Sequence, residues 1–288
     1  MAIMLSTPEV DDLGGAVHAL RDWQAEGAPM HLHPGDVGWF WRFGAEATAA
    51  AVRVWRRDDR ILAVGLLDEP TVLRMTMAPD VRHDESLARQ LFADVTEPER
   101  GVLPAGRANI EAPRDALVRE LLREDGWNTD DPWTPLRHDL SAPVDDPGVR
   151  IEVVGPDQVD ERVEVQRAAF EKSTFTAQRW HAMAAGSAYT DARCLLAYDD
   201  HGTAVAAVTV WSAGEGRPGL LEPMGVHRDH RGHGFGTAIT VAAAAALREL
   251  GSSSAIVCTP SSRVGAVATY KSAGFQPLPE VCDRYRAA

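Results

Sequence analysis

The feature that most constrains the fold of this 288-residue chain is an internal repeat. Three landmarks occur twice: a proline that opens a helical pattern, an arginine that follows an apolar stretch, and a glycine that closes a helix before an aromatic residue. The pairs are Pro8 and Pro156, Arg82 and Arg231, and Gly126 and Gly274, each 148 or 149 positions apart. A common offset for all three predicts two copies of one type of domain.

The boundary between the copies is marked by the stretch S-A-P-V-D-D-P-G-V after Leu140. Two prolines, a glycine and a polar centre are typical of a linker. We therefore expect domains at 1–142 and 150–288, joined by a linker at 143–149. The second domain reads as strand, two helices, three strands, helix, strand, helix and strand, and this order predicts an α/β fold that binds ligands beyond strand ends.

Composition excludes several classes of protein. The net charge of −13 argues against nucleic acid as the main partner. It would favour a cationic ligand, or it serves solubility alone. No apolar segment reaches the ~18 residues of a membrane span, and the N-terminus does not resemble a signal peptide. The three cysteines form no C-x-x-C pair, so we expect a cytoplasmic protein in a reducing environment.

The stretch V-H-R-D-H-R-G-H-G-F-G at 226–236 lies between a predicted strand and a predicted helix. Unpaired amides at the helix N-terminus, the helix dipole and glycines that permit close approach together predict a site for phosphate or pyrophosphate. A P-loop lysine is missing, and Thr237 stands at the last glycine position of a dinucleotide fingerprint. His227, His230 and His233 suggest a metal, but without H-E-x-x-H or a fourth ligand nearby we interpret them as loop histidines.

Two segments resemble the GNAT superfamily of N-acetyltransferases. Residues R-G-H-G-F-G at 231–236 are similar to its R/Q-x-x-G-x-G/A signature, and A-V-A-T-Y-K-S-A-G-F at 266–275 is similar to its A-x-x-x-Y-x-x-x-G-F. The resemblance covers 150–288 well and the first half weakly. It implies two tandem GNAT-like α/β domains, each with a central, mostly antiparallel mixed sheet flanked by helices.

The resemblance also implies acetyl-CoA as co-substrate, no metal, and a set of site residues. Backbone amides of the glycine loop would hold the pyrophosphate, and the preceding strand would contact the acetyl group and the pantetheine arm. The implied cofactor-binding residues are Met224, Gly225, Val226, Arg231, Gly232, His233, Gly234, Phe235, Gly236 and Thr237, with Arg263 where the family often has asparagine.

Two residues are the candidates for proton transfer. Tyr270 occupies the position where the family often has a general acid that protonates the departing CoA thiolate, a role that needs a directed hydrogen bond. Glu222, on the strand before the loop, is the candidate base, because burial would raise its pKa. Glu222 is equally a candidate anchor for a cationic substrate, and both roles stay open.

The acceptor is predicted from two neighbouring parts of the second domain. One is the segment between its first two helices, and the other is the start of its second helix. Glu171, Phe175 and Trp180 would suit a cationic amine. We expect an N-acetyltransferase for a primary amine of a small cationic molecule, such as an aminoglycoside of the kasugamycin type, with a role in antibiotic resistance. Alternatives are a mycothiol-synthase-like enzyme, a protein N-acetyltransferase, and an acyl-CoA-binding sensor or scaffold without turnover. A homodimer is left open.

The first domain is predicted to have lost the site. Aligned on Arg82, its loop places Glu85 opposite Gly234, with Asp84 beside it, and carboxylates would repel pyrophosphate. Leu122 stands at the tyrosine position. The aromatic-rich segment 31–41 is interpreted as core packing, with lining of the substrate cleft as the alternative.

Overall fold

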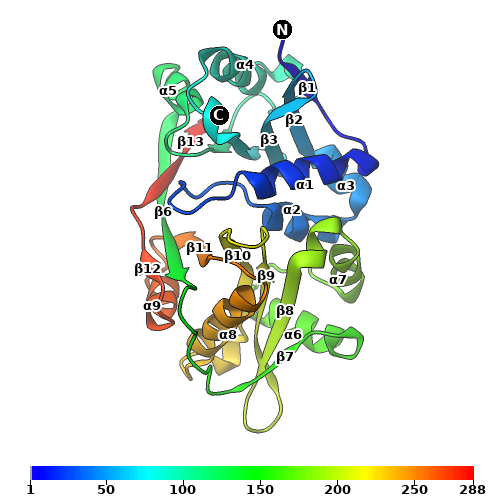
Figure 1. Cartoon of the computed structure of the whole chain (residues 1–288), viewed down its shortest axis with the longest axis vertical. Helices are drawn as coiled ribbons and strands as arrows, with labels where there is room; N and C mark the ends of the chain where they lie inside the picture. Colours follow the sequence, from blue (N-terminus) through cyan, green and yellow to red (C-terminus); the bar gives the residue numbers. More distant parts are fainter. Residues whose placement is uncertain (1) are drawn as a thin grey trace. The chain divides into compact units, whose positions relative to one another are not determined.

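The computed structural model describes residues 2–288 and divides into two compact units (Figure 1). Unit 1 contains residues up to His33 together with Ala45–Trp133 and Glu280–Ala288. Unit 2 contains Pro34–Gly44 and Thr134–Pro279. Within residues 2–288, no helix is both long and apolar enough to cross a bilayer.

Unit 1 is a mixed sheet with helices. Its strands follow the order β1-β2-β3-β4-β5-β13-β6, and β4 and β5 are the parallel neighbours. The strands are β1 (Met4–Ser6), β2 (Val52–Arg57), β3 (Arg60–Glu69), β4 (Val72–Met77), β5 (Ala108–Glu111), β13 (Val281–Arg286) and the first part of β6 (Asn128–Asp139). The helices include α1 (Leu13–Asp22), α3 (Ala45–Ala51), α4 (Glu85–Thr96) and α5 (Leu117–Glu124).

Unit 2 repeats this plan. Its strands follow the order β7-β8-β9-β10-β11-β6, and β10 and β11 are the parallel neighbours. The strands are β7 (Arg150–Val153), β8 (Ala192–Tyr198), β9 (Ala204–Trp211), β10 (Gly219–Val226), β11 (Ser254–Pro260), β12 (Gln276–Pro277) and the second part of β6. The helices include α2 (Pro34–Phe40), α6 (Val159–Ala169), α7 (Ala177–Ala184), α8 (Phe235–Glu249) and α9 (Val264–Ser272).

Helix α8 shows why the sequence of unit 2 folds in this way. Ile239, Ala243 and Leu247 are fully buried and stand four positions apart, so they form one apolar stripe along the helix. That stripe packs against β8, β9, β10 and β11. Alanines on either side of it permit close approach to the sheet, and Gly251 ends the helix with a φ of 81°.

The prediction of two α/β domains built on mixed sheets is confirmed, and the elements of unit 2 follow the expected order. The compact units nevertheless do not coincide with 1–142 and 150–288. The end of β6 completes the sheet of unit 2, and β13 from the end of the chain pairs with β5 and β6 in unit 1. The physical reason is that the last strand of each half of the sequence finds its ladder partners in the sheet built mainly from the other half.

Helix α2 is the second departure from the expected division, because it comes from the first half of the sequence and packs in unit 2. A Cβ added to Gly35 would lie 2.5 Å from Trp211 Cβ, and one added to Gly38 would lie 2.3 Å from Trp211 Cζ3. The two glycines therefore let α2 lie directly on the indole of β9.

In unit 1, the burial of the acidic residue Asp283 on β13 lowers the stability of the folded chain in a way that depends on pH. Burial, followed by the charge of Glu111, raises the pKa of Asp283 to about 7, although Arg119 and Arg74 act in the opposite direction. The folded chain thus binds this proton more tightly than the unfolded chain. The resulting loss of stability sets in as pH rises above about 4 and is complete above about 7.

We expect Asp283→Asn to stabilise the protein at pH 8 by on the order of 1–2 kcal/mol, because the amide removes the buried negative charge. The gain should shrink towards zero near pH 4.5, where the native carboxyl is already protonated. Calorimetric unfolding at both pH values measures this. Asp139→Asn is the control, because hydrogen bonds from Ser141 lower the pKa of Asp139 and its substitution should bring no such gain. An equal effect of Asp283→Asn at the two pH values would contradict the assignment.

Candidate functional site

The glycine-rich loop connects β10 to α8 through a short 3-10 turn at Arg228–His230. Gly232 and Gly234 have φ values of 82° and 86°, in the left-handed region that favours glycine. Gly234 is the N-cap of the 15-residue α8 and provides no side-chain cap. The first-turn amides of α8 are therefore not capped by a side chain, and the positive end of the helix dipole lies at the loop.

The glycines of the loop are needed for different reasons. A Cβ at Gly232 or Gly234 would meet nothing within 4 Å, so their requirement is conformational and the space beside the backbone is open. A Cβ at Gly236 would lie 3.0 Å from Thr269 Cγ2 and 3.4 Å from Val226 Cγ2. Gly236 therefore allows α8 to pack closely against α9 and β10. The result is an open backbone cradle of the kind that binds phosphate groups.

Strand β10 pairs with β9 in both its first and its last part, but with β11 only at its start. Gly219 and Leu220 pair in register with Ala255 and Ile256 of β11. A register shift follows Leu221, and residues 224–226 pair with β9 on the opposite side. The registered pairing with β11 thus ends before the part of β10 that leads into the glycine loop. This edge of β10 is where an extended ligand arm can lie beside the strand.

Tyr270 lies on α9, and only 6% of it is exposed. Burial raises the pKa of its phenol, and the charges of Glu222 and Cys258 raise it further. The phenol is therefore protonated at neutral pH. The charge of Glu222, the other residue predicted for proton transfer, thus acts on Tyr270 from β10. Glu222 is half-buried, and its carbonyl accepts a hydrogen bond of 2.6 Å from Trp211 Nε1.

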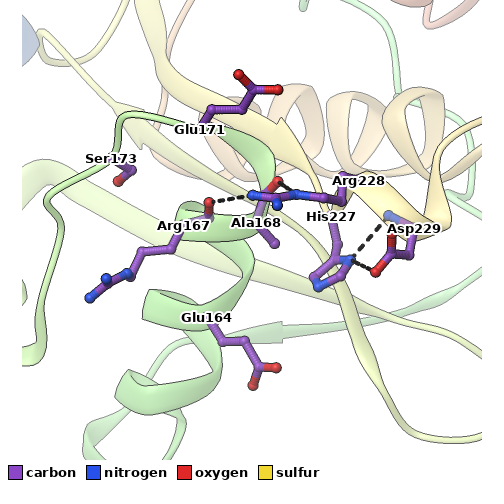
Figure 2. Close-up of a pocket in the computed structure, with 8 residues that line it drawn as sticks. All are labelled: Glu164, Arg167, Ala168, Glu171, Ser173, His227, Arg228 and Asp229. Atoms are coloured by element: carbon purple, nitrogen blue, oxygen red, sulfur yellow. Dashed lines mark hydrogen bonds and ion pairs between the residues drawn. The ribbon is translucent and has the colours of Figure 1, made fainter.

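The side chains of Arg228 and Arg231 bind the C-terminal end of α6. Arg228 Nε donates to the carbonyl of Ala168 at 2.9 Å, and its Nη2 donates to that of Arg167 at 3.2 Å (Figure 2). Arg231 Nη2 donates to the carbonyl of Ala169 at 2.8 Å. Cations at a helix C-terminus satisfy its free carbonyls and its dipole. Arg231, predicted to bind the cofactor, thus has a structural partner for its side chain.

The absence of a side chain at Gly225 lets the same end of α6 pack closely on β10. A Cβ there would lie 2.6 Å from Ala169 Cβ and 2.8 Å from Phe170 Cε2. Met224 and Val226, the other strand residues predicted to bind the cofactor, flank this contact and are partly exposed. The arginines and Gly225 together fix α6 against the strand and the loop.

The remaining residues predicted to bind the cofactor lie in or near the loop. Phe235, Gly236 and Thr237 form the first turn of α8, and His233 is exposed in the loop, 6.4 Å from the ring of Phe235. Arg263 is the exposed N-cap residue of α9. Within residues 2–288, no three His, Cys, Asp or Glu side chains are placed so that they could hold a metal ion.

The predicted acceptor residues are placed differently from one another. Phe175 and Trp180 are 2% and 7% exposed, so both side chains are buried in unit 2 and are not open to solvent. Glu171 is exposed and lines a cavity of about 490 Å³ with Arg228 (Figure 2). Trp39 of α2 lies against Phe175, with 5.3 Å between ring centroids. The signal for Trp39 in the sequence was the aromatic-rich segment 31–41.

The equivalent helix of unit 1 has a different N-terminus. Asp84 is the N-cap of α4, and its Oδ1 accepts a hydrogen bond of 2.8 Å from Leu87 N. Glu85 occupies the first turn, and Leu122, at the position that corresponds to Tyr270, is fully buried. A first-turn amide that α8 leaves uncapped is therefore satisfied in α4 by a carboxylate of the chain itself.

Residues 158–275 match the model of the acetyltransferase (GNAT) family. The fold of the whole chain is that of solved GNAT proteins. A GCN5-related N-acetyltransferase from Sphaerobacter thermophilus has a TM-score of 0.60 at 18% identity, over 99% of this chain and 95% of that one. A GNAT acetyltransferase from Colwellia psychrerythraea has a TM-score of 0.61 at 15% identity, over 99% of both chains.

A tandem GNAT protein from the clavulanic acid biosynthesis pathway is similar over the same length. Its TM-score is 0.61 at 17% identity, and the match covers 99% of this chain and 98% of that one. The tandem arrangement expected from the internal repeat is therefore confirmed. A comparison with curated proteins found no match.

Proposed function

We propose that this protein is an acetyl-CoA-dependent N-acetyltransferase whose reaction takes place in unit 2. The observation that carries the proposal is the uncapped, glycine-rich N-terminus of α8, with a buried Tyr270 on the neighbouring helix. Amides of 232–237 would hold the pyrophosphate of acetyl-CoA, and β10 around Met224, Gly225 and Val226 would lie beside the pantetheine arm. The family match makes acetyl transfer the expected chemistry.

The reaction that fits these groups is direct transfer. The neutral amine of the acceptor attacks the thioester carbonyl carbon, and the tetrahedral intermediate collapses as the carbon–sulfur bond breaks. Tyr270 donates its proton to the departing CoA thiolate, for which a phenol held protonated by burial is suited. Glu222 accepts the proton lost by the amine, or it binds a cationic acceptor. Both roles place its carboxylate on the acceptor side.

We further propose that unit 1 binds no acetyl-CoA and that the chain carries one cofactor site. The capping of α4 by Asp84 and the presence of Glu85 in its first turn support this. A carboxylate at this end of the helix opposes a second anion.

For the acceptor we propose a small molecule with a primary amine. The net charge of −13 and the exposed Glu171 support the cationic, kasugamycin-type amine expected from the sequence. Mycothiol-synthase-like and protein N-acetyltransferase activities are the alternatives. Cytoplasmic location, a role in antibiotic resistance and a homodimer stay predictions from the sequence.

The test is a screen of amines for acetyl-CoA-dependent release of CoA, with mass-spectrometric detection of the acetylated product. We expect at least one amine to gain an acetyl group. Tight binding of acetyl-CoA with no transfer to any class of amine, peptide N-termini included, would favour the sensor or scaffold alternative.

A further inference from the structure

A second pocket of unit 2 is lined by Phe175, predicted as an acceptor contact, and by Trp39 of the aromatic-rich segment 31–41, for which lining of the substrate cleft was the alternative. It has a volume of about 260 Å³ and lies between the α2 segment, the end of α6 and the connection from α6 to α7. Six side chains define its chemistry: the aromatic Trp39, Phe170 and Phe175 and the cationic Arg42, Lys172 and Arg179. The lining, as described by the structure, includes no Asp or Glu. The volume is smaller than the ~300–1,000 Å³ of whole-ligand sites, so the pocket fits one part of a ligand.

The aromatic wall and the cations are held by contacts within the pocket. Arg42 lies 4.2 Å from the Trp39 ring and donates to the Trp39 carbonyl at 2.7 Å. Arg179 donates to the carbonyl of Thr174 at 2.9 Å and also to its hydroxyl. Two of the three cations are thus positioned before any ligand arrives, which lowers the entropy lost on binding.

A fourth cation lies behind this wall. Arg162 is fully buried, donates to Gln166 Oε1 at 2.8 Å and to Cys194 Sγ at 3.0 Å, and lies 5.2 Å from the Phe175 ring. Its Nη2 is buried without a hydrogen-bond partner. Gln166 and Phe175 both line the pocket, so this charge is separated from it by one layer of side chains. Solvent screens a buried charge weakly, and an anion in the pocket would offset its field.

Phe170 connects this pocket to the proposed cofactor site. It lines the pocket, and its ring carbons would be 2.8 and 3.3 Å from a Cβ at Gly225, on the strand beside which the pantetheine arm is proposed to lie. A ligand in the pocket is therefore one aromatic ring away from β10. Glu171, adjacent to Lys172 in sequence, lines the neighbouring cavity and not this one.

We propose that this pocket binds a carboxylate group attached to an apolar part of the acceptor, so that the acceptor is an amine that also carries an anionic group. The apolar part packs on the partly exposed Trp39 and Phe170, and the carboxylate binds the basic rim. The role of the pocket in acceptor binding rests on the proposed function, whereas its preference for an anion does not. This substrate class differs from the purely cationic amine expected from net charge alone.

The test is a binding measurement on the full chain by calorimetry, with and without acetyl-CoA, using 3-phenylpropanoate and its neutral analogue 3-phenylpropanamide. We expect the carboxylate to bind at least about tenfold more tightly than the amide. The chain has two lysines, Lys172 and Lys271, which provide a matched pair. Lys172→Glu should reduce the ratio of the two affinities, carboxylate over amide, to about one. Lys271→Glu should leave this ratio unchanged.

Equal affinity of the wild-type chain for the two probes, or no binding of either at about 10 mM, would overturn the proposal. If both lysine variants lost the carboxylate preference to the same extent, the proposal would also be overturned, because the preference would then come from the general electrostatic field of the protein. If acetyl-CoA fails to bind while the carboxylate preference persists, the proposed function fails and the anion pocket stands.

Discussion

Replacement of Gly234 with glutamate is expected to weaken acetyl-CoA binding by at least about 100-fold. The substitution has two effects with separate causes. With a φ of 86°, any side chain at this position strains the backbone by roughly 1–2 kcal/mol. Glutamate also places a carboxylate at the N-terminus of α8, where the pyrophosphate is proposed to bind, and like charges repel there. The change reproduces the Glu85 of the first half.

The two causes are separated by matched variants. Gly234→Ala introduces the strain without the charge and should cost about tenfold in affinity or less. Gly216→Glu introduces the same carboxylate at a glycine with a φ of 72° and open space around it, and it should leave affinity unchanged. Calorimetric titration of acetyl-CoA measures all three variants. Retained affinity in folded Gly234→Glu would refute the phosphate cradle.

Removal of the Tyr270 hydroxyl is expected to lower kcat by about 10²-fold or more, with the Kd for acetyl-CoA unchanged. The phenylalanine ring preserves the packing of a residue that is 6% exposed, so the loss should be confined to proton transfer. Because the pKa of Tyr270 is raised, wild-type kcat should show no alkaline fall from this group below about pH 10. Steady-state kinetics and acetyl-CoA titration together check the result.

Tyr198→Phe is the control for this variant. Tyr198 is also a buried tyrosine of unit 2 with a raised pKa, and its hydroxyl donates to Glu161 Oε2 at 2.6 Å. Its loss should affect stability and leave kcat unchanged. If Tyr270→Phe changed neither kcat nor the pH profile, Tyr270 would not be the acid, and a water molecule or the solvent would have to protonate the thiolate.

The part of the site that the sequence predicted well depends on local rules. The glycines before α8, the N-terminus of that helix and the glycines that close α8 and α9 follow from backbone preferences, which neighbours in sequence determine. The order of strands and helices in unit 2 follows from the same kind of signal. Tyr270 was predicted from its motif position and Glu222 from its place on the strand before the loop, and the charge of Glu222 raises the pKa of Tyr270.

The part that the sequence did not predict depends on contacts between distant segments. Nothing local indicates that α2 packs on Trp211, that β13 pairs with β5, or that Arg231 binds the end of α6. Phe175 has the residue type of a ligand contact, yet it is buried against Trp39 from the other half of the sequence. For the same reason the basic pocket could not be predicted, because Arg42 lies 130 positions before Lys172.

The measurement that tests the central claim most directly is the stoichiometry of acetyl-CoA binding to the full chain by calorimetry. We predict one cofactor for each chain, bound at the loop of residues 232–237 and lost in Gly234→Glu. Two cofactors for each chain would contradict the assignment of unit 1 as a domain without a site. No binding to the folded protein would contradict the acetyltransferase proposal itself.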